Sequence, residues 1–241
     1  MLRDHRHLTF IRVASVSIAA LALSAAPALT GERSGWTYSI AAGASPRYEY
    51  RVDEFNFGSY PQSFGGGFSV SGSGIRPVTR HASLVIEGGY HAYRKGIGVE
   101  GFPEVPPTTG RLRAEFFSLG LGLRVEPSSD GPRRQSPYLQ ATPGLYVSRW
   151  EERTVDHEGY DLVQGTWRLR STHVDSFRSV LPGIALSVGV RGRVAGVVGS
   201  DIAVRLTRSA DLGEHVLGRF SSGEFRGLTE VAVVAGLSWS P

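Results

Sequence analysis

The chain has 241 residues, with 31 glycines, 13 prolines and no cysteine, and its formal net charge is +4. The absence of cysteine excludes disulfide bonds and thiolate metal sites, and glycine and proline argue against long helices because both are costly inside a helix. The basic residues form no stripe interleaved with aromatic side chains, so the composition gives no support to nucleic-acid binding.

The N-terminal residues have the pattern of a secretory signal peptide. Arginines precede the apolar run 13–23, and small residues follow it. The run is too short for a membrane-spanning helix, which needs roughly 20 residues. We therefore expect residues 1–28 to be removed, with cleavage after Ala26 or Ala28, and residues 29–241 to form one β-barrel domain. Removal leaves 23 basic and 21 acidic residues, so the mature chain is nearly neutral.

Further along the chain, apolar residues alternate with small or polar ones at the period of two that characterises a β-strand. Eight segments show this alternation, at residues 35–44, 62–75, 82–95, 111–126, 136–150, 177–191, 197–208 and 228–239. No mature segment approaches 18 consecutive apolar residues, which excludes helical membrane spans. The pattern predicts an all-β fold built from eight antiparallel strands.

The second face of these strands distinguishes a soluble barrel from a membrane barrel. In segment 111–126, for example, Phe117 and Leu119 alternate with Ser118 and Gly120. A soluble barrel would carry charge on its outside, whereas here the second face consists mainly of Gly, Ala, Ser and Thr with isolated charges. Outer-membrane barrels alternate apolar-out with polar-in, and eight strands leave an interior just wide enough for side chains. The sequence thus predicts an eight-stranded up-and-down transmembrane β-barrel with a filled lumen.

The connections between the segments alternate in length. The long ones are residues 45–61, 96–110, 151–176 and 209–227, and the short ones are near 76–81, 127–135 and 192–196. This asymmetry is typical of long extracellular loops and short periplasmic turns. The same topology predicts two aromatic girdles, with Trp36, Tyr138 and Trp239 at the inner rim and Phe64, Tyr90, Phe116, Phe117, Tyr146, Trp150 and Phe177 at the outer rim.

Three stretches carry a family resemblance, at residues 116–124, 137–146 and 231–239. Through them the chain resembles the small outer-membrane barrel superfamily of the OmpA, OmpX and opacity-protein type. The resemblance implies location in the bacterial cell outer membrane and contact with outer-membrane lipid and lipopolysaccharide. It also implies assembly by the barrel-assembly machinery, which reads a terminal aromatic residue in such families; here Trp239 is followed by two further residues.

Ionisable side chains on the lumen face of the predicted strands form a candidate charge network. They are Glu87, His91, Arg124, Asp201, Arg205 and Glu230. Unpaired charges in a narrow lumen would be costly. We therefore expect opposite charges to pair and to plug the barrel, with Arg205 in contact with Glu230 because their strands are neighbours.

Patterns for catalysis and metal binding are weak. Glu87 shares a face with His91, but four residues along a strand span roughly 13 Å, so a catalytic partner of this histidine would have to come from another strand. No serine lies in a recognisable nucleophile motif. His157, His173 and His215 have carboxylates beside them but lack the spacing of metal ligands. We expect no catalytic residue, no metal site and no cofactor.

Three function classes remain open. A structural or surface-binding, adhesin-like barrel predicts a closed lumen and exposed loops; a narrow OmpW-like solute channel predicts a continuous pore or an apolar lateral route; a lipid-modifying barrel enzyme predicts a Ser–His site at the rim. The sequence favours the first class. An extracellular ligand would then meet the long loops, chiefly 151–176, where Trp150, Tyr160 and Trp167 are contact candidates.

Overall fold

The computed structural model describes residues 35–45, 48–54, 58–64, 66–99, 108–127, 135–161, 166–195, 197–217 and 221–240. The expected signal peptide lies outside these residues. The strands are β1 (Thr37–Ser45), β2 (Tyr48–Glu54), β3 (Gly58–Phe64), β4 (Gly67–Pro77), β5 (Ala82–Val99), β6 (Thr108–Val125), β7 (Gln135–Asp161), β8 (Thr166–Ala195), β9 (Val198–Ser209), β10 (Gly213–Leu217), β11 (Ser221–Phe225) and β12 (Thr229–Trp239). Among the described residues, no helix is long and apolar enough to cross a membrane.

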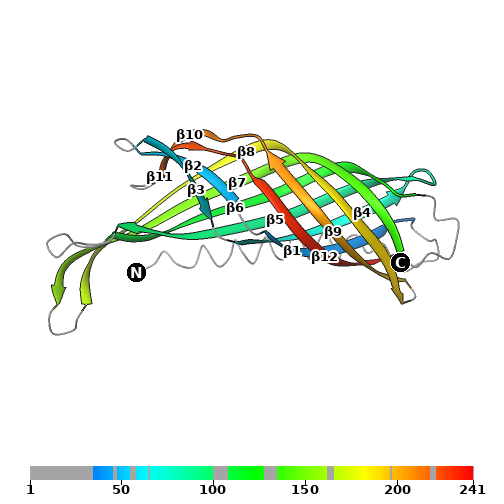
Figure 1. The fold of residues 1–241 in the computed structure, drawn as a ribbon, viewed down its shortest axis with the longest axis horizontal. Coiled ribbons are helices and arrows are strands. Elements are labelled where there is room, and N and C mark those ends of the chain that lie inside the picture. Colours follow the sequence, from blue (N-terminus) through cyan, green and yellow to red (C-terminus); the bar gives the residue numbers. More distant parts are fainter. Residues whose placement is uncertain are drawn as a thin grey trace.

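Eight of the strands close into one antiparallel barrel, in the order β1, β12, β9, β8, β7, β6, β5 and β4 (Figure 1). These are the eight segments that the alternation predicted, so the expected all-β, eight-stranded barrel is confirmed. The ring closes through β1, which pairs with β12 on one side and with β4 on the other.

Three of the long connections are more ordered than expected. Within 45–61 and 209–227, β2 pairs with β3 and β10 pairs with β11 as separate hairpins. Most of the expected loop 151–176 is a continuation of β7 and β8, which stay paired as far as Asp161 and Thr166 despite two register shifts. The sequence did not reveal this hairpin because neither face of a strand pair in water has to be apolar, so the alternation fades there.

The exterior of the barrel is apolar. Outward side chains such as Leu121 and Val188 are 56% and 62% exposed, and each of the eight barrel strands has at least one exposed large apolar residue on its outward face. On β6 this belt runs from Phe117 to Val125, which is about 27 Å along the strand and about 20 Å along the axis at a tilt of about 40°. An exposed apolar band of this size needs a hydrocarbon environment around it.

The apolar belt predicts a strong dependence of stability on height along the barrel. Val188→Arg places a charge within the belt and should destabilise the folded barrel by about 2–4 kcal/mol in lipid vesicles. Val174→Arg is the matched control, because Val174 points outward on the same strand and is 57% exposed, but lies beyond the belt; we expect its cost to stay below about 1 kcal/mol. Urea unfolding in vesicles measures both, and equal costs would contradict the position of the belt.

Candidate functional site

The six ionisable residues expected in the lumen all lie inside the barrel. Each is at most 7% exposed. They come from four strands, with Glu87 and His91 on β5, Arg124 on β6, Asp201 and Arg205 on β9 and Glu230 on β12. The structure places them in three groups at successive heights along the barrel, and the first two groups are linked through Gln140.

The first group is centred on Arg124. Its Nη1 lies 3.5 Å from Asp201 Oδ2, and its guanidinium carbon lies 3.9 Å from the centre of the Tyr138 ring. The hydroxyl of Tyr138 donates a hydrogen bond of 2.5 Å to Asp201 Oδ1. One carboxylate is thus shared between a cation and a phenol, and the cation is stacked on that same phenol.

The second group is an ion pair between Glu87 and Arg205. Gln140 connects it to the first group: its Nε2 donates to Glu87 Oε2 at 2.7 Å and to Thr142 Oγ1 at 3.1 Å, and its Oε1 accepts from Arg124 Nε at 2.9 Å. Gln140 was not among the expected site residues, although it has the same inward parity. A side-chain amide suits this position because its NH₂ group donates to a carboxylate while its oxygen accepts from a guanidinium.

The third group joins His91 to Glu230, with Nδ1 and Oε2 2.5 Å apart. The expected contact between Arg205 and Glu230 is therefore replaced by two other pairs. Opposite Arg205 on β12 stands Ala232, while Glu230 faces Thr207. In a lumen this narrow, side chains from non-adjacent strands meet across the axis, and Arg205 accordingly pairs with Glu87 on β5 instead of with a residue of its neighbour β12.

Glycines of β8 make room for two large rings inside the barrel. A Cβ atom at Gly189 would lie 2.7 Å from Cζ of Tyr138, and one at Gly183 would lie 2.6 Å from Cε2 of Tyr146. Both distances are shorter than a side chain tolerates, so the rings can lie against the wall only where the wall has no side chain. This close packing explains part of the small-residue pattern on the lumen face.

Above the polar groups, toward the outer hairpins, the lumen is filled by an aromatic cluster. Its buried members are Phe64, Tyr93, Leu112, Ala114, Phe116, Tyr146, Trp150, Leu181, Phe225 and Leu228. Trp150 is its centre: the ring stacks on Phe177 at 6.1 Å between centroids and meets Phe225 edge-on at 4.8 Å.

This cluster corrects part of the expected aromatic girdle and one of the contact candidates. Phe64, Phe116, Tyr146 and Trp150 were expected at the outer rim facing lipid, but all four are buried. Trp150 is 0% exposed, so it cannot contact an extracellular ligand. The cause is strand parity, because Trp150 belongs to the inward-facing residues of β7. Beyond the charge network, the outer part of the lumen is filled by apolar side chains. At the inner rim, Tyr138 likewise points inward, toward Asp201.

Two hairpins cover the aromatic cluster. Phe64 at the end of β3 and Phe225 at the end of β11 both belong to it, and β11 lies beside β2. The four short strands gather at one end of the barrel in Figure 1. His215 on β10 stacks on Phe177 with 4.2 Å between ring centroids. These hairpins therefore close the outer end of the lumen on one side.

The long β7–β8 hairpin extends past this end (Figure 1). Tyr160 and Trp167 lie opposite each other in its register, near the tip; their side chains are outside the described part. Nearer its base, Ser171 Oγ and Asp156 Oδ2 lie 3.3 and 3.5 Å from Nε2 of His173. Both partners thus meet the same ring nitrogen, whereas a catalytic triad needs the acid on one nitrogen and the nucleophile on the other. No group of three potential metal ligands occurs among the described residues.

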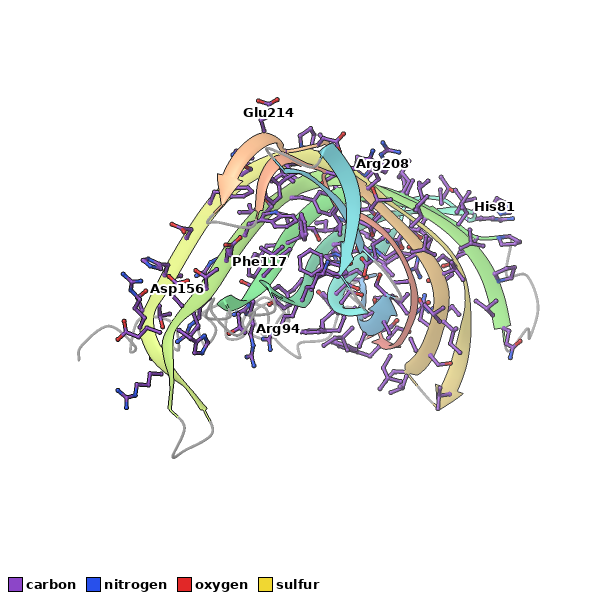
Figure 2. The ribbon with its side chains drawn as sticks, turned by 60° about the vertical axis from the view of Figure 1, so that its left-hand side comes forward. His81, Arg94, Phe117, Asp156, Arg208 and Glu214 are labelled. Carbon is purple, nitrogen blue, oxygen red and sulfur yellow. The ribbon has the colours of Figure 1, made fainter. Side chains whose placement is uncertain are left out.

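The other histidines of the long connections lie on the outer hairpins. His157 lies at the register shift of the β7–β8 hairpin, and His215 has its Nε2 3.1 Å from the carbonyl oxygen of Leu212. Glu214, next to His215, is exposed and projects away from the barrel in Figure 2. These positions suit a hairpin surface in water.

No family model matches the chain, and no curated protein is similar to it in sequence. Among solved structures, Neisserial surface protein A has 15% identity, with 86% of this chain and 98% of that chain covered and a TM-score of 0.43. Ail, the attachment invasion locus protein of Yersinia pestis, has 12% identity, coverage of 84% and 98%, and a TM-score of 0.38. The translocator domain of the autotransporter NalP from Neisseria meningitidis has 10% identity, coverage of 97% of both chains, and a TM-score of 0.35.

Surface protein A and Ail are eight-stranded outer-membrane barrels, the kind of protein that the sequence resembles. Likenesses this distant carry no argument about function. The fold of this chain rests on its own strand register.

The Glu87–Arg205 pair allows a direct test of the lumen network. Arg205→Met should destabilise the barrel by about 3–5 kcal/mol because it leaves Glu87 buried without a counter-charge. The double variant with Glu87→Gln should cost clearly less than the sum of the two single changes. Urea unfolding of the refolded barrel in detergent micelles provides the four free energies.

The Arg149–Glu151 pair is the control for this cycle. Its atoms Nη2 and Oε2 are 2.9 Å apart, but the pair lies on the outward face and is partly exposed. We expect a coupling below about 1 kcal/mol there. Additive effects at Glu87 and Arg205 would show that these two side chains do not stabilise one another.

Proposed function

We propose that this chain is an outer-membrane surface barrel with a closed lumen, whose activity lies in its extracellular hairpins and has a structural or adhesin-like character. The observation that carries the proposal is the double filling of the lumen, by the charge network and by the aromatic cluster. A barrel sealed at two heights leaves only its two ends and its lipid-facing wall for contact with other molecules.

The lumen argues against the channel alternative. The small cavity beside Glu87 and Arg205 is lined by Ser118, Thr142 and Tyr146 among others and has a volume of about 10 Å³, which is room for about one water molecule. A solute would have to break the Glu87–Arg205 pair and then displace Trp150. Each step exposes buried charge or buried aromatic area, so an OmpW-like route along the axis is not favoured.

The enzyme alternative lacks a suitable site in the described part of the chain. The Ser171, His173 and Asp156 group has the residue types of a hydrolase but shares one ring nitrogen, as described above. The buried His91 has its Nδ1 against Glu230 and lies inside the barrel, away from any lipid substrate in the membrane. Neither arrangement supports catalysis on an acyl chain.

The β7–β8 hairpin is the best-placed binding element. From Trp150 to Asp161 it continues for about 37 Å beyond the aromatic cluster, and its residues include exposed apolar side chains, Leu169 and Val174, among charges of both signs. An extended two-stranded hairpin also offers its edges for strand addition by a partner. We retain Tyr160 and Trp167 as contact candidates and propose a polar extracellular partner.

The closed lumen predicts electrical silence. In planar lipid bilayers the refolded protein should give no stable conductance steps, while a trimeric porin inserted under the same conditions gives steps of its usual size. Persistent channel openings of the unmodified protein, seen with preparations whose folding is verified by heat-modifiable migration, would contradict the proposal.

The hairpin predicts separable folding and binding. Replacing residues 157–170 by Asn-Gly leaves Asp156 and Ser171 paired across a two-residue turn that suits such a hairpin. The shortened barrel should keep its heat-modifiable folding, because the buried contacts of the mouth remain. Bacteria that display it should lose adherence to epithelial cell layers.

A full-length control separates the effect of losing the two contact candidates from the effect of shortening the hairpin. Tyr160→Ala with Trp167→Ala keeps the strand pairing and removes only the large side chains. Loss of adherence in both variants would assign binding to the tip, whereas normal adherence of the shortened barrel would exclude the hairpin as the binding element.

A further inference from the structure

Arginines gather on the outward face of β5 to β8, just beyond the apolar belt on the side of the outer hairpins. This arginine patch comprises Arg94, Arg111, Arg113, Arg149, Arg153 and Arg178. Its direction follows from strand parity: the patch shares the parity of Phe117 and Val147, whereas the alternate residues Leu112 and Trp150 are buried inside. On β5, Arg94 has the parity of Tyr90, which lies opposite Phe117 in the register.

The register sets arginine directly against arginine in three neighbouring rows. The pairs are Arg94 with Arg113, Arg111 with Arg153, and Arg149 with Arg178. Side chains directly opposite one another in antiparallel strands have Cβ atoms about 5 Å apart, and like charges in this position destabilise the sheet. An anion placed between two guanidinium groups converts that repulsion into attraction.

The patch is only partly neutralised by the protein itself. Glu115 accepts hydrogen bonds from the Tyr90 hydroxyl and from Arg113, and Glu151 pairs with Arg149. Of the six arginines, Arg113 and Arg149 therefore have a carboxylate partner on the same face. Arg94, Arg111 and Arg153 are exposed, and none of the described residues forms an ion pair with them.

Directly below the patch lies an aromatic strip on the lipid-facing wall. Phe68 and Tyr90 have ring centroids 5.8 Å apart, and Tyr90 and Phe117 have centroids 4.9 Å apart. Aromatic side chains of this kind mark the boundary between hydrocarbon and headgroups. The patch therefore stands at headgroup height, with the apolar belt continuing below it.

The arginines are concentrated on one side of the barrel. At the same end, the outward residues of β1, β4 and β12 are Ala44, Phe68 and Thr229, and the outward face of β9 has a single arginine, Arg208. A general requirement for solubility or for repulsion between copies would be met by charges around the whole ring. A one-sided patch above an aromatic strip instead fits one amphiphile that has acyl chains below and anionic groups above.

We propose that the arginine patch binds the phosphate groups of a lipopolysaccharide-type glycolipid in the outer leaflet. Arginine is suited to this role because its planar guanidinium makes two parallel hydrogen bonds to a phosphate. Glu115 acts as a positioning residue, since it holds Arg113 against the Tyr90 hydroxyl. The inference deepens the proposed function and rests on it, because the patch meets lipid only if the barrel is inserted in the membrane.

The test uses the folded barrel in nanodiscs of phosphatidylcholine and compares bis-phosphorylated lipid A with its dephosphorylated form by native mass spectrometry. Unmodified protein should retain the phosphorylated form at least tenfold better. The variant with Arg94→Gln, Arg111→Gln and Arg153→Gln should lose this preference by about tenfold or more, because three charge-assisted contacts disappear. Equal retention by the variant and the unmodified protein would overturn the proposal.

A matched control changes three exposed arginines elsewhere. Arg76→Gln, Arg80→Gln and Arg208→Gln remove the same charge from residues outside the patch, and this variant should keep the full preference. Glu151→Gln provides a gain-of-charge variant, which releases Arg149 and should strengthen retention several-fold. Unchanged or weaker retention in Glu151→Gln would contradict a role for the patch charge.

Two further measurements separate the possible failures. Protease protection in the nanodisc reports insertion, so a barrel that does not insert contradicts the proposed function, while an inserted barrel without preference contradicts only the lipid site. Competition with a soluble sulfated polysaccharide reports the source of the anion. Failure of the polysaccharide to displace lipid A supports the lipid assignment, and displacement at micromolar concentration would overturn it in favour of a soluble polyanion.

Discussion

A ring of eight strands encloses a lumen so narrow that side chains alone fill it. The other features of the structure depend on this narrow width. Inward residues can meet partners from across the axis, as Glu87 of β5 meets Arg205 of β9. A charged residue in the lumen must therefore pair with an opposite charge, which can come from any strand of the ring. The link from Arg205 through Glu87 and Gln140 to Arg124 is such a match, made by residues of four strands. Closure of the lumen is a consequence of this matching and needs no separate plug.

The sequence predicted the parts of the fold that depend on a two-residue period. A strand between hydrocarbon and a packed interior has two different faces, so its alternation is strong, and all eight barrel strands followed from it. The same parity placed the six ionisable residues inside. Their partners could not be predicted, because pairing across the axis depends on stagger and ring curvature. Hence Arg205 was expected to meet Glu230 but meets Glu87.

Other features of the structure were not predicted from the sequence, for related reasons. Outside the membrane neither face of a strand has to be apolar, so the β2–β3 and β10–β11 hairpins and the extension of β7 and β8 left a weak pattern. The aromatic residues at the mouth were expected to face lipid because they stand at the height of a girdle. Height and direction are independent, however, and the parity of Trp150 already pointed inward. Giving parity priority over aromatic type would have placed it in the cluster.

At the outer end of the barrel, inward residues pack in the lumen and outward residues form the exposed surface. Inward residues of β6 and β7, such as Leu112 and Trp150, close the barrel, and the outward residues between them on the same strands are largely arginine. Because the two sets alternate, the packing of the buried cluster fixes the backbone positions from which the arginines project. Binding of an anion between them then needs no rearrangement of the backbone, which lowers the entropic cost of binding. The cluster that fills the lumen therefore also positions the arginine patch, so a substitution of Trp150 would affect both the packing of the lumen and the patch.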